Sequence, residues 1–130
     1  MLARKSLFKR KVVGMHMATI LVTGGSGMLG QHLVPMLKEN GHLVQAPTRQ
    51  ELDLTDAQAT LSFLKDKQID VVVHCAAYVT GIASSKSTKH HSLDVNVAMG
   101  LNLIRACLQQ GVSKLINVGS ATVYPNNAEQ

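Results

Sequence analysis

Residues 20–34, ILVTGGSGMLGQHLV, decide which fold to expect from this chain. The run ATILVTG at 18–24 is apolar and rich in β-branched residues, which predicts a buried strand. Glycines then recur at every third position, and leucines at helical spacing follow them. A glycine triplet alone is a weak signal, but here it follows a strand and opens a helix, which is the context that a dinucleotide-binding turn requires.

Each glycine of the triplet has a separate physical role in such a turn. Gly24 allows a tight turn off the strand, Gly27 lets the backbone approach a pyrophosphate, and Gly30 lets the helix pack close to the sheet. Free N–H groups at the helix start, including those of Met28 and Leu29, then face the phosphates together with the positive end of the helix dipole. A purely structural turn is the alternative. A Walker motif is excluded because no Gly-Lys-Ser/Thr follows.

The first half of the chain after the glycines is predicted to hold a helix, two short strands and a second helix. The first helix covers 28–40 and ends at Gly41, and the strands are HLVQA at 42–46 and ELDL at 51–54. Thr55 and Gln58 fit a capping box, which predicts a helix from there to about Lys67.

The second half is predicted to hold two buried strands with a loop and a long helix between them. DVVVHCAA at 70–77 is apolar without alternation, as in a strand covered on both faces, and KLINVGS at 114–120 is a similar strand. The polar run at 80–92 indicates a loop. An apolar stripe at helical spacing then predicts a helix that ends at Gly111; its members are Leu93, Val97, Leu101, Ile104 and Leu108.

This alternation of strands and helices predicts an α/β fold, a doubly wound (Rossmann) and mainly parallel sheet that stops after the fifth strand. The expected order of strands across the sheet is 51–54, 42–46, 18–24, 70–77 and 114–120. Residues 18–130 form the dinucleotide-binding domain in this interpretation, and residues 1–17 form a disordered basic extension.

The identity of the dinucleotide depends on the end of the second strand. NAD sites usually carry an acidic residue there, which bonds the ribose hydroxyls. This chain has Ala46-Pro47-Thr48-Arg49 instead. A guanidinium can bind a 2′-phosphate through two hydrogen bonds, so Arg49 favours NADP over NAD, with a solvated loop arginine as the alternative.

The net charge of +5 comes from the N-terminal extension. This extension has no acidic residue, and its basic residues are Arg4, Lys5, Lys9, Arg10 and Lys11. The remaining basic residues balance the eight acidic ones, and aromatic residues make up only 3%, which argues against a nucleic-acid surface. The extension is compatible with an early start codon, a mitochondrial-type presequence or a segment that adheres to anionic surfaces.

Two further features bear on location and on metals. No apolar run is long enough to span a membrane. The spacing of Cys75 and Cys107 suggests neither a metal site nor a redox pair, so reduced thiols and a cytoplasmic location are expected. The histidines of KHH at 89–91 are expected to be solvated, and no metal site is predicted.

Several motifs together resemble the extended short-chain dehydrogenase/reductases, the NAD-dependent epimerase/dehydratase family. They are TGGSGMLG, DLTD, VVHCAAY, VNVAMGLNLIRAC and VGSATVYP, and they span about residues 18–126. TRQELDLTD, VTGI and Tyr124-Pro125 are most similar to the GDP-L-fucose synthase branch of this family, and SATVY is equally similar to the UDP-glucose 4-epimerase branch.

The resemblance implies roles for individual residues. Ser120 would be catalytic and bond the sugar hydroxyl or keto oxygen. Asp53 and Leu54 would lie near the adenine. The ribose and diphosphate would be contacted by Ala76, Ala77 and Tyr78, and Asn96 would face the cofactor from the long helix. A strand-end cap remains open for Ser120, and a helix-surface position for Asn96.

The chain lacks one part of the family pattern. A catalytic Tyr-x-x-x-Lys is expected roughly 25–30 residues after Ser120 by this resemblance, and the sequence stops at Gln130. The expectation is therefore the coenzyme-binding part of a nucleotide-sugar epimerase or reductase, inactive as given and a homodimer when full length. A non-catalytic NAD(P)-sensing module and an inert truncated remnant are the alternatives.

Overall fold

The computed structural model describes residues 17–79 and 85–120 of the protein, and side chains at 85–89 are outside that description. The described elements are β1 (Thr19–Thr23), α1 (Gly30–Glu39), β2 (Leu43–Gln45), α2 (Ala57–Lys67), β3 (Val71–His74), α3 (Ser85–Gln110) and β4 (Lys114–Asn117). The predicted basic extension lies outside the described residues, apart from Met17.

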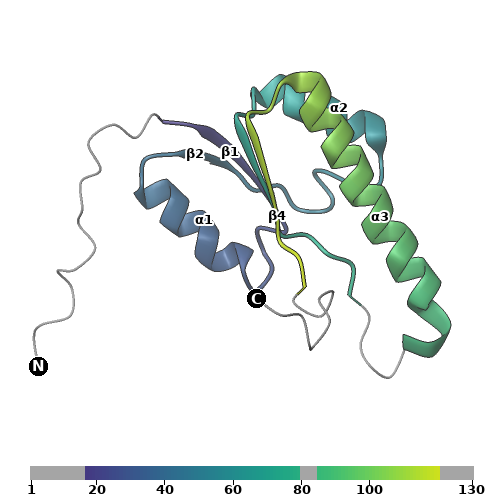
Figure 1. The fold of residues 1–130 in the computed structure, drawn as a ribbon. Coiled ribbons are helices and arrows are strands. Elements are labelled where there is room, and N and C mark those ends of the chain that lie inside the picture. The colour runs from purple at the N-terminus through teal and green to yellow at the C-terminus, as the bar shows by residue number, and fades with distance from the viewer. Residues whose placement is uncertain (1–16, 80–84, 121–130) are drawn as a thin grey trace, which may run out of the picture.

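The four strands form one sheet in the order β2-β1-β3-β4, and every pair is parallel. Figure 1 shows α1 on one face of this sheet and α2 and α3 on the other. The doubly wound Rossmann prediction is therefore confirmed, and the four strands have the predicted order. Because all strands run the same way, their carboxyl ends meet at one edge of the sheet, toward the bottom of Figure 1.

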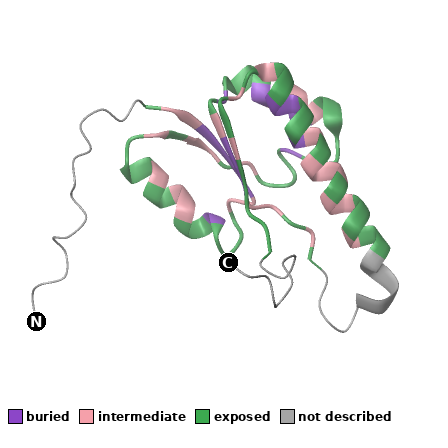
Figure 2. Ribbon diagram, in the orientation of Figure 1, coloured by how far each residue is buried: buried purple, intermediate pink, exposed green. Residues whose placement is uncertain are grey.

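Two apolar clusters stabilise the two faces of the sheet, and Figure 2 shows the buried residues concentrated in the central strands and in one end of α3. Leu21 and Val72 pack with α2 and α3 residues such as Leu64 and Leu103. Ile20, Val22 and Val73 form the opposite cluster against α1. The alternation follows from the strand period of two residues, which sends successive side chains to opposite faces.

The predicted strand at 51–54 is absent, and this prediction was wrong. Leu52 and Leu54 are buried in the core and Asp53 is exposed, so the alternation that suggested a strand is real. The backbone has other partners, however. The Leu52 N–H donates to the carbonyl of Thr48, and the Leu54 carbonyl accepts from the Asn102 side chain, so no strand ladder forms.

The N-cap of α2 lies one residue later than predicted. Asp56, rather than Thr55, is the cap, and its carboxylate accepts a hydrogen bond from the Ala59 N–H at 2.9 Å. Thr55 instead donates to the Asp53 carboxylate through both its backbone N–H and its hydroxyl. Threonine and aspartate are both favourable N-cap residues. Because the Thr55 hydroxyl is bound to Asp53, Asp56 caps the helix instead.

The helix α3 begins at Ser85, so the loop prediction for 80–92 was wrong for 85–92; residues 80–84 lie outside the described residues. Helix propagation costs little once the long apolar part has formed, and this outweighs the weak propensities of serine, threonine and histidine. No helix in the described part of the chain is both long and apolar enough to cross a membrane.

The apolar stripe of α3 faces outward, contrary to what a core stripe would do. We call it the outer stripe; its members, all exposed, are Leu93, Val97, Leu101, Ile104 and Leu108. The buried face of α3 carries Leu103, Ala106 and Cys107 instead. β4, predicted to be buried, is also mostly exposed, because it is the edge strand of the described sheet.

Candidate functional site

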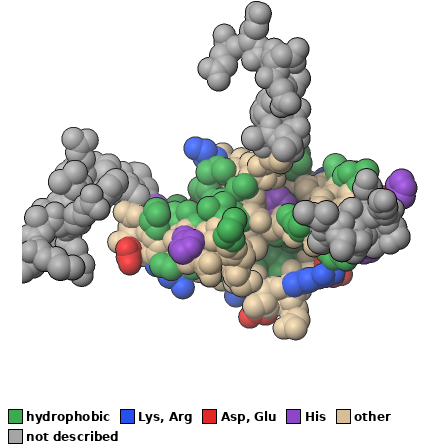
Figure 3. Space-filling model, turned by 90° about the horizontal axis from the view of Figure 1, so that it is seen from below, with side chains coloured by type: hydrophobic (Ala, Val, Ile, Leu, Met, Phe, Trp, Pro, Cys, Tyr) green, Lys and Arg blue, Asp and Glu red, His purple; other side chains and the backbone are tan. Residues whose placement is uncertain are grey.

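A cavity of about 290 Å³ opens at the carboxyl ends of the strands. Such an edge is where doubly wound folds bind ligands. Eight residues singled out from the sequence line it: Gly24, Gly27, Arg49, Asp53, Leu54, Ala76, Ala77 and Tyr78. Figure 3, which views this end from below, shows apolar side chains gathered on the side of α1 and acidic and basic side chains mixed along the lower edge.

Sequence reasoning missed about half of the cavity lining. The additional residues are Thr23, Ser26, Pro47, Thr48, Leu52, Thr55, Cys75, Val95 and Met99. Most of them are chain neighbours of the predicted residues, so the ends of the predicted strands were the available signal. Val95 and Met99 lie on α3, where the stripe pattern pointed to a different face of the helix.

Gly24 is required by both its backbone conformation and its surroundings. Its φ is +68°, in the left-handed region that favours glycine. A Cβ at Gly24 would lie 2.7 Å from the backbone nitrogen of Ala76, at the end of the neighbouring strand. The turn off β1 therefore packs directly on the segment that follows β3.

Gly30 has a role different in detail from the prediction. A Cβ there would collide with the carbonyl oxygen of Gly24 and lie 2.6 Å from the Cα of Gly25. The close approach thus joins the start of α1 to its own turn rather than to the sheet. Gly25, which the sequence did not single out, is restricted by the Ala46 Cβ at 2.8 Å.

Gly27 keeps the start of α1 open. Only the Gly24 carbonyl lies near its missing Cβ, at 3.2 Å, and the residue is exposed. The cap residue Leu29 makes no side-chain cap bond, and the first turn of α1 has no acidic side chain. Among the described residues, the N–H groups of Met28, Leu29 and Gly30 have no hydrogen-bond acceptor. Unpaired N–H donors at a helix start are the kind of group that binds anions in other proteins.

Met28, Leu29 and Gly30 do not line the cavity, although the sequence predicts that they bind the coenzyme together with Gly24 and Gly27. The Met28 and Leu29 side chains are exposed. Met28 and Leu29 therefore offer a ligand only their backbone N–H groups, because their side chains lie on the outer surface.

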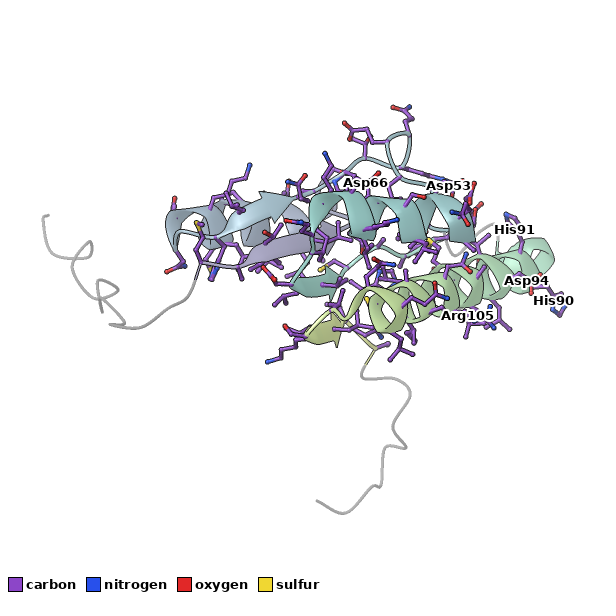
Figure 4. The ribbon with its side chains drawn as sticks, turned by 90° about the horizontal axis from the view of Figure 1, so that it is seen from above. Asp53, Asp66, His90, His91, Asp94 and Arg105 are labelled. Atoms are coloured by element: carbon purple, nitrogen blue, oxygen red, sulfur yellow. The ribbon has the colours of Figure 1, made fainter. Side chains whose placement is uncertain are left out.

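Arg49 and Asp53 line the cavity together with Gly24 and Gly27 of the glycine turn. Hydrogen bonds from the Thr55 hydroxyl and the Thr55 backbone N–H hold the pKa of the Asp53 carboxyl below its usual range, with a smaller contribution from Arg49. Figure 4 shows Asp53 beside α2, at the same end of the molecule as His91. The site therefore presents one guanidinium and one ionised carboxylate to a ligand.

Asn96 holds the wall of the cavity rather than lining it. The Tyr78 N–H donates to the Asn96 Oδ1 at 2.8 Å, and the Asn96 Nδ2 donates to the Tyr78 carbonyl at 2.9 Å. This reciprocal pair uses both ends of the amide. The predicted role of Asn96 toward the coenzyme stays a prediction; in the structure Asn96 holds Tyr78, which lines the cavity.

Asn102, one and a half turns further along α3, supports the other wall and was missed from the sequence. Its Nδ2 donates to the carbonyls of Leu54 and Thr55, both at 3.0 Å. An amide side chain next to the buried Leu103 was the only signal for it. Two asparagines of one helix thus hold the two segments that border the cavity.

Ser120 is exposed and follows β4, outside the cavity lining. Within the described residues, no group of three or more His, Cys, Asp or Glu side chains is placed to hold a metal ion.

Burial of His74, next to the cavity, lowers the pKa of its ring below the usual 6.5. The unfolded chain then binds the proton more readily than the folded chain, so protonation favours unfolding. The His74 contribution to stability is complete above pH 6.5 and is lost as the pH falls below it. We expect the free energy of unfolding, measured with urea, to decrease between about pH 7 and pH 5. His74→Asn, which cannot titrate, should show a shallower decrease, and an unchanged slope would contradict this assignment.

Residues 20–130 match the NAD dependent epimerase/dehydratase family. The chain is 38% identical over 106 residues to a GDP-L-fucose synthase of Azorhizobium caulinodans, covering 82% of this chain and 34% of that protein. It is 31% identical over 110 residues to a GDP-L-colitose synthase of Yersinia pseudotuberculosis, covering 85% and 36%. The chain thus spans about a third of the length of the curated relatives it matches.

A solved structure also resembles this chain. A GDP-mannoheptose C4 reductase from Campylobacter jejuni, solved with NADP bound, superimposes with a TM-score of 0.79. It is 31% identical in sequence, and the match covers 89% of this chain and 37% of that one.

Proposed function

The chain belongs to the NAD dependent epimerase/dehydratase family, and we propose that it binds NADP as the coenzyme-binding part of a nucleotide-sugar reductase or epimerase. One observation carries this proposal. The N–H groups of Met28, Leu29 and Gly30 have no acceptor among the described residues, and they lie at a helix start beside the cavity-lining turn of Gly24 and Gly27. Unpaired amides of this kind are satisfied by phosphate oxygens.

The residues present fit a dinucleotide along the whole cavity. Gly27 leaves room at the helix mouth for a pyrophosphate. Arg49 provides a cation for a 2′-phosphate, and Leu52 and Leu54 provide apolar surface for a base. Ala76, Ala77 and Tyr78 line the same cavity, and we call this segment the Ala76–Ala77 wall.

When bound, the nicotinamide would supply the hydride chemistry. The residues of this chain would bind and orient it: Gly24 and Gly27 by close backbone approach, and Arg49 by charge. Ser120 would hydrogen-bond the reacting oxygen of the substrate, as the family resemblance implies. Ser120 follows β4, and the carboxyl end of β4 lies at the sheet edge where the cavity opens.

The substrate class comes from the relatives. The names of the three relatives reported above concern GDP-linked sugars, and further relatives are dTDP-4-dehydrorhamnose reductases. We therefore infer a nucleotide-sugar substrate for the whole enzyme. The solved neighbour with NADP bound favours NADP over NAD for the coenzyme.

The first expected result is a preference for NADPH in calorimetric titration of the purified chain. The wild-type chain should bind NADPH more tightly than NADH, since the 2′-phosphate gains a charge-assisted bond to Arg49. Arg49→Gln removes the cation and should weaken NADPH binding about tenfold while leaving NADH binding nearly unchanged.

A control separates the phosphate cradle from the 2′-phosphate contact. Gly27→Ala places a Cβ 3.2 Å from the Gly24 carbonyl oxygen, a tight contact that needs a small backbone shift, and it narrows the helix mouth. It should weaken the binding of both coenzymes alike and lower the melting temperature by only a few degrees. The proposal fails if folded wild-type protein binds neither coenzyme, and the NADP preference fails if Arg49→Gln affects both equally.

We also infer that the outer stripe of α3 mediates self-association of the protein as a homodimer. Five exposed apolar side chains at helical spacing on one helix are the pattern of a helix-packing seam, and the stripe contains no charged member. Sedimentation velocity should show a concentration-dependent dimer that Leu101→Glu reduces. Leu43→Glu, an exposed leucine on β2, is the matched control. If Leu101→Glu and Leu43→Glu reduce the dimer fraction equally, the outer stripe is not the dimer interface.

A further inference from the structure

Two buried polar side chains meet beneath the cavity, at the ends of adjacent strands. The Thr23 Oγ1 lies 2.6 Å from the His74 Nδ1. Thr23 is 2% exposed and His74 is 8% exposed, and the two residues are direct partners in the pairing of β1 with β3. The function proposed above does not use either side chain.

Thr23 also accepts a second hydrogen bond. The Ala76 N–H donates to the Thr23 Oγ1 at 3.3 Å, and a backbone N–H can only donate. The hydroxyl oxygen has a second lone pair and one hydrogen, so Thr23 can donate to the His74 Nδ1 or accept from it, according to which ring nitrogen carries the hydrogen. When the ring is neutral with its hydrogen on Nε2, the hydroxyl donates to Nδ1.

This chain of bonds joins the two walls of the cavity. Thr23 immediately precedes Gly24, the first residue of the glycine turn. Ala76 is the residue whose backbone nitrogen lies 2.7 Å from where a Gly24 Cβ would be. Two hydrogen bonds thus connect His74, the Thr23 hydroxyl and the Ala76 N–H. They join the start of the glycine turn to the segment that contains Ala76.

We propose that Thr23 and His74 are positioning residues for the coenzyme, which set the separation between the glycine turn and the Ala76–Ala77 wall. This inference rests on the proposed NADP-binding function. Neither residue needs to touch the coenzyme through its side chain. Their effect is to hold the backbone of the cradle in its binding geometry before the ligand arrives.

The competing explanation is a buried polar pair that contributes only to stability. Thr60 provides a matched comparison because it is 0% exposed and its hydroxyl donates to the Asp56 carbonyl at 2.7 Å. Thr60 lies in α2 and does not line the cavity. Thr23→Val and Thr60→Val therefore remove the same chemical group from equally buried sites, one inside the proposed path and one outside it.

The experiment measures the NADPH dissociation constant by calorimetry and the unfolding midpoint for each variant of the full 130-residue chain. Both valine variants should lower the midpoint. Only Thr23→Val should weaken NADPH binding, by about tenfold, whereas Thr60→Val should stay within twofold of wild type. Thr23→Ser keeps the hydroxyl and should restore most of the affinity.

A second pair of variants tests the histidine and remains informative if Thr23→Val does not fold. His74→Asn places an amide oxygen near the position of Nδ1 and retains an acceptor for the Thr23 hydroxyl. His74→Leu has no acceptor. Binding should be nearly kept in the first and weakened several-fold in the second, both at neutral pH.

The outcomes separate the two proposals. Equal affinities for Thr23→Val and Thr60→Val, or for His74→Asn and His74→Leu, would overturn the positioning role while wild-type binding stands. A folded wild-type chain that binds no NADPH would overturn the proposed function, and the positioning role with it.

Discussion

Gly24→Ala is expected to destabilise the protein by about 3 kcal/mol and to abolish coenzyme binding at micromolar ligand. The alanine must adopt a left-handed backbone conformation, because φ at Gly24 is +68°. It would also lie 2.7–2.9 Å from backbone atoms of Cys75 and Ala76, which belong to the end of the neighbouring strand and cannot rotate away. Urea denaturation measures the first effect, and calorimetry with NADPH measures the second.

Gly111→Ala is the matched control for this prediction. Gly111 has the same φ of +68°, but nothing lies within 4 Å of its missing Cβ. Its replacement should cost only the left-handed strain, about 1 kcal/mol, and leave coenzyme binding unchanged. If Gly24→Ala is no more harmful than Gly111→Ala, the close approach of the turn to Ala76 is not a constraint on the fold.

Leu103→Ala should destabilise the protein by about 3 kcal/mol, because it opens a cavity in the core beneath α3. Leu103 is 1% exposed and packs in the cluster that includes Leu21, Leu64 and Val72. Urea titration measures this loss in the free energy of unfolding. The dependence of that free energy on urea concentration should match wild type.

Leu101→Ala, two residues away on the same helix, tests which face of α3 is buried. Leu101 is 46% exposed and belongs to the outer stripe. The change should cost less than about 1 kcal/mol in the monomer, since a surface leucine loses little contact. Equal losses for the two variants would mean that the stripe packs inward, as its spacing in the sequence suggests.

Much of the coenzyme site could be predicted from the sequence because its signals are local. Gly24, Gly27 and Gly30 act through backbone geometry within seven residues, and the strand before them is a continuous apolar run. Local geometry of this kind depends on residue type at fixed spacing. Arg49 and Asp53 line the same cavity as Gly24 and Gly27, and their contact with a coenzyme stays a prediction.

The support behind that site could not be predicted, because it depends on residues far apart in the chain. Thr23 and His74 are 51 positions apart, and Asn102 is 48 positions from Leu54. A threonine at a strand end or an asparagine in a helix has many possible partners. Which partner it has is decided only when the sheet and α3 bring the two segments together.

The same distinction explains the errors about 51–54 and the apolar stripe. Apolar spacing shows that a segment has an apolar side, and Leu52 and Leu54 do lie in the core. It does not show whether the backbone finds a strand partner, and here the Leu54 carbonyl is bound by Asn102 instead. Nor does it show which of two helix sides meets the sheet: α3 has apolar residues on both, and Leu103, Ala106 and Cys107 take the core.

The sequence by itself determined the order of elements, the parallel sheet and the glycine turn at the end of β1, because strand runs, helix periods and left-handed glycines are properties of a few consecutive residues. Only the tertiary structure decided which face of α3 is buried and that 51–54 is a loop held by a hydrogen bond from Asn102. It also decided that the Thr23 and His74 side chains are hydrogen-bonded next to the cavity. These depend on contacts between distant segments, whose free energies exist only once the chain has packed.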